Sequence, residues 1–595
     1  MDLPDDYEKS IPHYLEYKKL VNLGPVAQDL LKKRYLKRDS EGNIVEDFVG
    51  MFYRIANNIA QAEKNYGGDS ETVELQFFHH LTSGDFIPAS PILMNAGNKL
   101  QYLFSDHALD VPDSLEEIFD VLKVAASIQQ HGGGVGFSFS RVRPRNDDVK
   151  GLKNVAFGPL SVMHIFDTSF SAILQGGRRV GANMAVLHVS HPDVLAFIEV
   201  KKNFGVLQNF NLSVAITDDF MKAVEEDGDF DLINPRNKEL VKKIKAKELF
   251  NSLVENAWST GDPGIIFIDE MNRKYPFKDK EVLCTGACGQ YQLESFEGIP
   301  YAHINLPNLL IKKEDGSSVI DFDKLKYLTH LTVRFLDNTI DMHKYINPLI
   351  EEKTKRVRKI GLGVMGFADL LFSLKISYGS DESLKVIEDI MTVIRDESRK
   401  ESAQLALKRG SFPAHEESSW KQPMRHAAIT SIAPTGSTSL IAQTSQSVEP
   451  VYAFSFTTTT SEGKEYTILN KTFKEAVDAL DVDRNAKIQL NFVDSVQKID
   501  WLEDSFKEIF KTATDVSPME HLKVMATFQK FVDNSISKTI NLPNQATIKD
   551  VEKIIKEAHA LNCKGITIYR DACRGDQVLV TKTQTRLSAF EEAYE

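Results

Sequence analysis

Two of the chain's four cysteines lie within the short segment CTGACGQ, residues 284 to 290. If this segment is extended, Cys284 and Cys288 lie roughly 13 Å apart on one face, beyond the ~7 Å limit between the Cα atoms of a disulfide. A zinc site needs further Cys or His ligands at a typical spacing, and Cys563 and Cys573 have no CxxC or HxxxH pattern near them. We therefore expect no metal site. Cys288 is then either a small buried apolar side chain or a reactive thiol.

Two Gly-rich segments have the composition of anion-binding loops. QGGRRVGANM, residues 175 to 184, combines glycines, which allow close approach of the backbone, with two arginines that can contact an anion bidentately. APTGSTS, residues 433 to 439, follows a strand-like run. If a helix starts there, its unpaired N–H groups and nearby hydroxyls form an anion site, although the spacing is not that of Walker A. Each segment alone is equally compatible with an ordinary loop.

The elements that must position these residues change in character along the chain. The first ~80 residues repeat apolar side chains at helical spacing, as in VEDFVGMFYRIANNIAQAEKNY. From about residue 86, short apolar stretches bounded by Gly, Pro or Asn alternate with helical patterns, which favours an α/β barrel or a doubly wound sheet. We predict an N-terminal helical region at 1–85, an α/β domain at 86–575 and a polar C-terminal tail at 576–595.

Composition and charge exclude several classes of function. The chain has 71 Lys and Arg against 84 Asp and Glu, a net charge of -13, so no global positive field attracts nucleic acid. MDLPDDYEKS lacks the layout of a signal peptide, and no run approaches ~20 apolar residues. We expect a cytoplasmic protein with no nucleic-acid or membrane partner, in which the cysteines are kept as thiols.

Eleven segments, in the same order, resemble the catalytic subunit of adenosylcobalamin-dependent ribonucleotide reductases across roughly residues 25 to 580. They are PASPILMNAG, GGGVGFSFSRVRP, QGGRRVGANM, NFNLSVAITDDFM, GDPGIIFIDEMN, CTGACGQ, RKIGLGVMGFADLL, SIAPTGSTSLIA, VEPVYA, VDNSISKTINLP and CKGITIYRDACR. The resemblance implies a ten-stranded α/β barrel with a central finger loop. Cys288 matches the cysteine that, in this family, becomes a thiyl radical and abstracts the 3′-hydrogen of a ribonucleotide.

The resemblance also implies the cofactor, the partners and the binding residues. The cofactor is adenosylcobalamin, the substrate is a nucleotide, a deoxynucleoside triphosphate is the effector, and the chain forms a homodimer. The substrate-binding positions are Ser90, Ser105, Asp106, Gly134, Pro434, Thr435, Gly436, Ser437 and Thr438. The specificity loop, which links the effector to the choice of base, comprises Gln175, Gly176, Gly177, Arg178, Arg179, Gly181 and Asn183.

The chain departs from the family pattern around its radical cysteine. The family motif is Asn-Pro-Cys-Gly-Glu, whereas this chain has Gly286, Ala287 and Gln290 around Cys288. In the family the Glu accepts the proton of the 3′-hydroxyl, but a Gln amide can only hydrogen-bond that hydroxyl because it does not titrate. The family's redox cysteine pair is replaced by Asp106 and Ile299, and the C-terminal CxxC that recharges the pair is missing.

Three hypotheses remain open from the sequence. The chain is a reductase with another electron donor, as in the glycyl-radical relatives that use formate. Alternatively, it is a redox-neutral radical enzyme that modifies nucleotides, or an inactive nucleotide-binding homologue. We favour a thiyl-radical enzyme that acts on a nucleotide, because the radical cysteine and both Gly-rich segments are retained while the usual proton acceptor and electron donors are missing.

Overall fold

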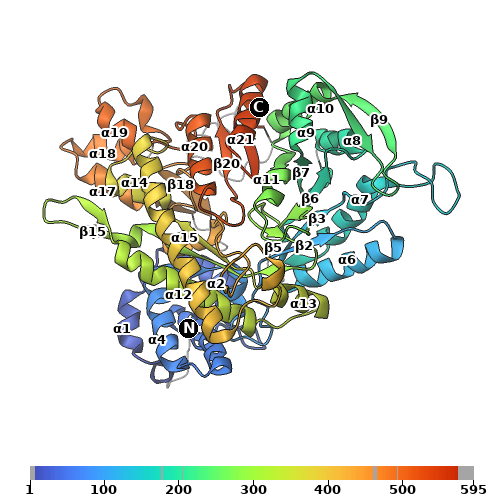
Figure 1. The fold of residues 1–595 in the computed structure, drawn as a ribbon. Coiled ribbons are helices and arrows are strands. Elements are labelled where there is room, and N and C mark those ends of the chain that lie inside the picture. The colour runs from blue at the N-terminus through green and yellow to red at the C-terminus, as the bar shows by residue number, and fades with distance from the viewer. Residues whose placement is uncertain (1–6, 176–178, 204, 460–464, 492, 574–595) are drawn as a thin grey trace.

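The computed structural model describes residues 7–175, 179–203, 205–459, 465–491 and 493–573 (Figure 1). Its N-terminal part contains the helices α1 (Tyr14–Leu20), α2 (Pro25–Arg34), α3 (Phe48–Ala60) and α4 (Ser70–Thr82). Asp47 and Asp69 cap α3 and α4 by accepting hydrogen bonds from backbone N–H groups of the first turn. The apolar face of α3 packs against α4 and against α12 (Phe322–Met342). The predicted tail, residues 576–595, lies outside the described residues.

The first half of the barrel is a set of five parallel strands. They are β2 (Asp106–Asp110), β3 (Gly134–Ser138), β6 (Asn183–His188), β7 (Asn211–Ile216) and β10 (Gly264–Phe267), adjacent in that order. Helices α6 (Leu115–Gln130), α7 (Gly158–Ser171) and α10 (Ala246–Thr260) lie in the connections between these strands. Most strand residues are buried on both faces, as expected of a parallel sheet with helices outside it.

The second half is also parallel and is built from five extended segments. They are residues 298–305, which include β13 (Gly298–Ile299) and β14 (Tyr301–Asn305), then β17 (Gly361–Met365), residues 430–432, residues 536–542 with β20 (Thr539–Leu542), and β21 (Gly565–Arg570). The two halves meet antiparallel, where β21 pairs with β10 and β13 pairs with β2. The ring therefore closes with ten extended segments, and the prediction of a ten-stranded barrel is confirmed.

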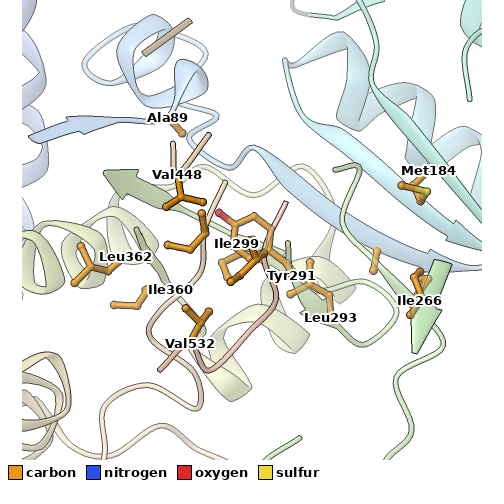
Figure 2. Close-up of a cluster of buried hydrophobic side chains, with 14 of the residues drawn as sticks. Ala89, Met184, Ile266, Tyr291, Leu293, Ile299, Ile360, Leu362, Val448 and Val532 are labelled. Carbon is orange, nitrogen blue, oxygen red and sulfur yellow. The ribbon is translucent and has the colours of Figure 1, made fainter. Parts of the chain in front are cut away.

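Buried apolar side chains of the barrel and of the helices around it form one large hydrophobic cluster. Figure 2 shows part of it, with Met184 and Ile266 from the first half and Leu362 from the second. Tyr291 and Ile299 lie between them in this view. Helices α12, α15 (Asp381–Arg409) and α20 (Pro518–Gln529) pack on the outside of the second half (Figure 1). In the described ranges no helix combines the length and the apolar character that crossing a bilayer requires.

Candidate active site

Cys288 lies at the turn of a short hairpin that enters the barrel. Strands β11 (Cys284–Thr285) and β12 (Gln292–Leu293) pair antiparallel and leave residues 286–291 as the connecting loop, the finger loop of this structure. Within it, Gly289 N–H donates to Gly286 O at 3.2 Å, and Gly286 N–H donates to Tyr291 O at 3.2 Å. Gly289 has φ +85°, a left-handed conformation that favours glycine. The sequence therefore folds into a tight turn directly after the cysteine.

The finger loop contacts both halves of the barrel. On the first half, a Cβ added at Gly136 of β3 would lie 1.8 Å from Thr285 O, so only glycine allows this approach. On the second half, Ser535 N–H donates to Gln290 O at 2.9 Å, and a Cβ added at Gly361 of β17 would meet the Tyr291 hydroxyl at 2.8 Å. These contacts place the loop inside the ring, and the predicted central finger loop is confirmed.

Asp106, at the start of β2, holds the finger loop by its side chain. Its Oδ1 accepts a hydrogen bond from Ala287 N–H at 2.8 Å, and its Oδ2 accepts one from Gln290 Nε2 at 3.3 Å. Both Asp106 and Gln290 are buried, at 3% and 0% exposure. A Cβ added at Gly286 would lie 2.9 Å from Asp106 Oδ1, so the carboxylate occupies the space that a side chain at position 286 would need.

The two positions of the family's redox pair lie directly opposite each other on adjacent antiparallel strands. Ile299 of β13 is the register partner of Asp106 of β2. Directly opposed residues of antiparallel strands point to the same face, with Cα atoms about 4.5–5.5 Å apart. The geometry would suit a cysteine pair, but an acidic side chain and a fully buried aliphatic one stand there. Next to them, Gly134 N–H donates to Ser105 O at 2.7 Å, while the buried Ser105 Oγ has no partner among the described residues.

The other cysteines are buried: Cys284 lies in the finger-loop hairpin, and Cys563 and Cys573 lie just before and just after β21. All four cysteines lie in the described part of the chain, where no disulfide joins any two of them. Burial raises the pKa of the Cys284 thiol well above its usual range and that of Cys563 to about 12, so both stay protonated. Cys573 is also buried, whereas Cys288 is partly exposed. Of the four cysteines, Cys288 is the least buried.

The predicted phosphate turn forms the start of a short helix, α16 (Gly436–Ala442), directly after the barrel segment 430–432. Thr435 adopts a left-handed conformation, φ 56°, and its Oγ1 accepts a hydrogen bond from Ser447 N–H at 2.7 Å. A Cβ added at Gly436 would meet no atom within 4 Å, so the backbone at this residue is open. Thr438 Oγ1 donates to Thr435 O at 3.3 Å, while Ser437 is partly exposed.

Ser90 begins helix α5 (Ser90–Asn95), which follows strand β1 (Phe86–Pro88). Helix α16 packs against β1 and α2, so the turn at 434–438 is brought near the segment that carries Ser90 although they are far apart in the chain. The Ser90 hydroxyl lies 2.8 Å from that of Tyr35. Tyr35 was not identified as a site residue from the sequence, and no local pattern marks it.

The predicted specificity loop is described in part. Gln175 ends β4 (Leu174–Gln175), which pairs with Arg179 and Val180 of β5, whereas Gly176, Gly177 and Arg178 lie outside the described residues. Two further members are held by helix α6. A Cβ added at Gly181 would lie 2.9 Å from the Gln129 side chain, and Asn183 accepts a hydrogen bond from Gln129 Nε2. Asn183 Nδ2 also donates to Asn209 O at 3.0 Å, so its side chain links neighbouring strands.

Two groups that define the loop geometry were missed from the sequence. The Gly-rich run at 132–140 is compatible with tight main-chain packing or with a plain strand turn, and the structure shows that Gly136 allows Thr285 to approach it closely. Ala287 was noted only as a departure from the family's Pro, yet its N–H is the donor to Asp106. The sequence did contain one indication: Ala287 replaces the family's Pro and therefore has a backbone N–H that Pro lacks.

The chain is similar in sequence and in structure to known proteins of one family. The family model "Ribonucleotide reductase, barrel domain" matches residues 105–426 and 420–569, and "Ribonucleotide reductase, all-alpha domain" matches residues 21–101. A vitamin B12-dependent ribonucleoside-diphosphate reductase of Thermoplasma acidophilum is 40% identical over 588 residues, covering 96% of this chain and 75% of that protein. One of Mycobacterium tuberculosis (strain H37Rv) is 38% identical over 565 residues, covering 94% and 79%. The solved class Id ribonucleotide reductase alpha subunit of Actinobacillus ureae matches with a TM-score of 0.74 and 22% identity, covering 93% and 98%.

Proposed function

The chain belongs to the ribonucleotide reductase family, and we propose that it is an adenosylcobalamin-dependent catalytic subunit in which Cys288 becomes the radical that acts on a bound nucleotide. The observation that carries this proposal is the position of Cys288. It is a partly exposed cysteine at the tip of a loop that both halves of the barrel hold in place. A thiyl radical removes hydrogen from carbon only when sulfur and carbon are held together away from water, which a barrel interior provides.

The residues around Cys288 fit a cofactor that must reach its sulfur. A Cβ added at the adjacent Gly289 would meet no atom within 4 Å, so there is open space on that side of the thiol. Cys288 and Gly289 would face the cofactor. When bound, adenosylcobalamin supplies a carbon radical that removes the hydrogen atom of a thiol. The named B12-dependent relatives, which match nearly the whole chain, support this choice of cofactor.

The substrate would be held by its phosphate and by its ribose. The backbone at Gly436 and the residues around it, with Ser90 nearby, provide hydrogen-bond donors for a phosphate. Near Cys288, the Oε1 of the buried Gln290 has no hydrogen-bond partner among the described residues, so it can accept a bond from a ribose hydroxyl. Together, these two groups would suit a ligand that carries anionic and hydroxyl groups.

We further propose that the protein acts in the cytoplasm as a homodimer whose 175–183 segment responds to a deoxynucleoside triphosphate. The hairpin of β4 and β5 joins helix α7 to strand β6, so a ligand bound there has a short route to the barrel. If deoxynucleoside triphosphates alter neither nucleotide affinity, measured by calorimetry, nor oligomeric state, measured by light scattering, this part of the proposal is wrong.

The electron donor differs from the family's dithiol. Asp106 and Ile299 occupy the two positions of the cysteine pair. Because neither side chain is a thiol, these positions cannot supply the two electrons that reduction of the ribose requires. This favours an external donor such as formate. The same observation favours a second candidate function, a redox-neutral radical reaction in which Cys288 abstracts a hydrogen atom and returns it after rearrangement or elimination.

Anaerobic incubation with adenosylcobalamin and each nucleotide tests the proposed function. Products are identified by mass spectrometry with a dithiol, with formate and with neither. A deoxynucleotide formed with formate identifies a reductase with an altered donor, and a modified nucleotide without any reductant identifies the redox-neutral enzyme. No product and no consumption of the cofactor under any condition would leave a nucleotide-binding homologue and refute the proposal.

A further inference from the structure

Three departures from the family pattern, at positions 286, 287 and 290, all contact a further departure, Asp106. Ala287 donates the N–H that the family's Pro lacks, and Gln290 donates from its amide. Gly286 leaves the space in which the family's Asn would meet the Asp106 carboxylate at about the 2.9 Å measured for an added Cβ. With an acid at position 106, the family's Pro would leave one of these hydrogen bonds unmade, its Glu would add a second carboxylate, and its Asn would need space that the Asp106 side chain occupies.

This network puts a carboxylate beside the position from which the family's Glu has gone. Asp106 Oδ2 lies 3.3 Å from the Nε2 of Gln290, so the acid is one hydrogen bond away from the side chain at position 290. A carboxylate accepts hydrogen bonds at about four lone-pair sites. A substrate hydroxyl that accepts from the second N–H of the Gln290 amide could therefore donate its own proton to the Asp106 carboxylate.

We propose that Asp106 is the catalytic proton acceptor of this enzyme and that Gln290 orients the substrate hydroxyl towards it. The inference rests on the proposed function. In the step concerned, the Cys288 thiyl radical takes the hydrogen atom from C3′, so that an S–H bond forms and the C3′–H bond breaks. The 3′-hydroxyl loses its proton to an Asp106 carboxylate oxygen, so that the carboxylate becomes a carboxylic acid and the sugar a ketyl radical anion. The carboxyl function of position 290 has thus moved to position 106, where the family has a redox cysteine.

A purely structural role for Asp106 makes different predictions, because a neutral amide at this position keeps most of its contacts. In Asp106→Asn the new side-chain oxygen would still accept from Ala287 N–H, and the Gln290 amide can turn to present its oxygen to the new amide N–H. The variant therefore retains the loop but has no titrating acceptor. Asp106→Asn combined with Gln290→Glu returns the carboxylate to the family's position while preserving an amide–carboxylate pair between the two residues.

The experiment measures tritium release from a 3′-tritiated ribonucleotide incubated anaerobically with the full chain and adenosylcobalamin. Asp106→Asn should lower the rate by about 10²-fold or more, the usual contribution of a general base, with nucleotide affinity by calorimetry unchanged. The double variant should regain at least tenfold over the single one. Asp110→Asn is the matched control, since it removes a carboxylate from the same strand and the same strand face, and it should behave as the wild type.

Wild-type rates in Asp106→Asn, or a double variant no faster than the single one, would overturn the assignment of Asp106 as proton acceptor. A loss of nucleotide binding in Asp106→Asn that the double variant does not restore would also overturn it, in favour of a structural role. If the wild type itself releases no tritium and consumes no cofactor, the proposed function fails first, and the inference fails with it. Cofactor consumption by the wild type therefore separates the two failures.

Discussion

Replacing Asp106 and Ile299 together by cysteine should create a disulfide within the barrel. The two residues are register partners on antiparallel strands, so their Cα atoms are about 4.5–5.5 Å apart, within the roughly 4.4–6.8 Å range of disulfides. The bond would close a loop of about 190 residues, which stabilises by roughly 5 kcal/mol in the chain-entropy model. With an unfolding entropy of ~2.1 cal/mol/K per residue, the oxidised form should melt about 4 °C above the reduced form.

The comparison is made between the two redox forms of one variant, because the lost Asp106 hydrogen bonds then affect both equally. Mass spectrometry after thiol labelling counts the cysteines, and differential scanning fluorimetry gives the melting temperatures. The single variant Ile299→Cys is the control, since it adds a thiol without a partner at position 106. If the double variant keeps both new thiols under oxidising conditions, or if its oxidised and reduced forms melt at the same temperature, positions 106 and 299 are not register partners. The restored pair should not by itself give dithiol-driven turnover, because position 290 still has no carboxylate.

Three further predictions concern the loop, the phosphate turn and a buried histidine. Gly136→Ala should displace the finger loop, because the added Cβ would lie 1.8 Å from Thr285 O, and should lower the rate of tritium release about 10²-fold. Gly228→Ala is the control: its added Cβ makes ordinary contacts at 3.6 Å, so the rate should not change. Gly436→Asp should abolish nucleotide binding by calorimetry, and unchanged affinity would defeat the phosphate assignment. Burial lowers the pKa of His303 to about 3, so between pH 6.5 and 3 the unfolded chain binds a proton that the folded chain does not. Folding stability should therefore fall as the pH drops below 6.5, by about 1.4 kcal/mol from this residue at pH 5.5, and His303→Gln should show a smaller decrease in melting temperature between pH 7 and 5.5.

The fold was predictable because its signals are local or are carried by motifs. Gly- and Pro-bounded apolar stretches marked the strand segments, and the ordered motifs identified the barrel in which they close. The closure itself depends on pairs such as Ile432 with Ile536, which are far apart in the chain and have no local signature. For the same reason the close approach of Gly136 to Thr285 could not be inferred from a Gly-rich run.

The candidate site was predictable as a set of positions but not as a network. The motif placed Cys288, Gln290 and Asp106 at one site, and it identified each as a match to or a departure from the family. It did not reveal that Asp106 contacts the other departures, because that requires the backbone of Ala287 and the side chain of Gln290 to converge on one carboxylate. Gly176, Gly177 and Arg178 remain predictions, since they lie outside the described residues.

The central claim is that Cys288 carries the radical, and the serine variant tests it most directly. Serine is nearly isosteric with cysteine, but its O–H bond is much stronger than S–H, so it cannot be converted to a hydrogen-abstracting radical by the same initiator. The measurement is transfer of tritium between the 3′ position of a nucleotide and the 5′-carbon of adenosylcobalamin under anaerobic conditions. Cys284→Ser is the matched control, because it alters the buried cysteine of the same hairpin, whose Sγ lies 3.8 Å from Gly136 O.

We predict that the wild type and Cys284→Ser transfer tritium, whereas Cys288→Ser folds and binds nucleotide with unchanged affinity but transfers none. Transfer by Cys288→Ser at the wild-type rate would contradict the account and assign the radical chemistry to another residue.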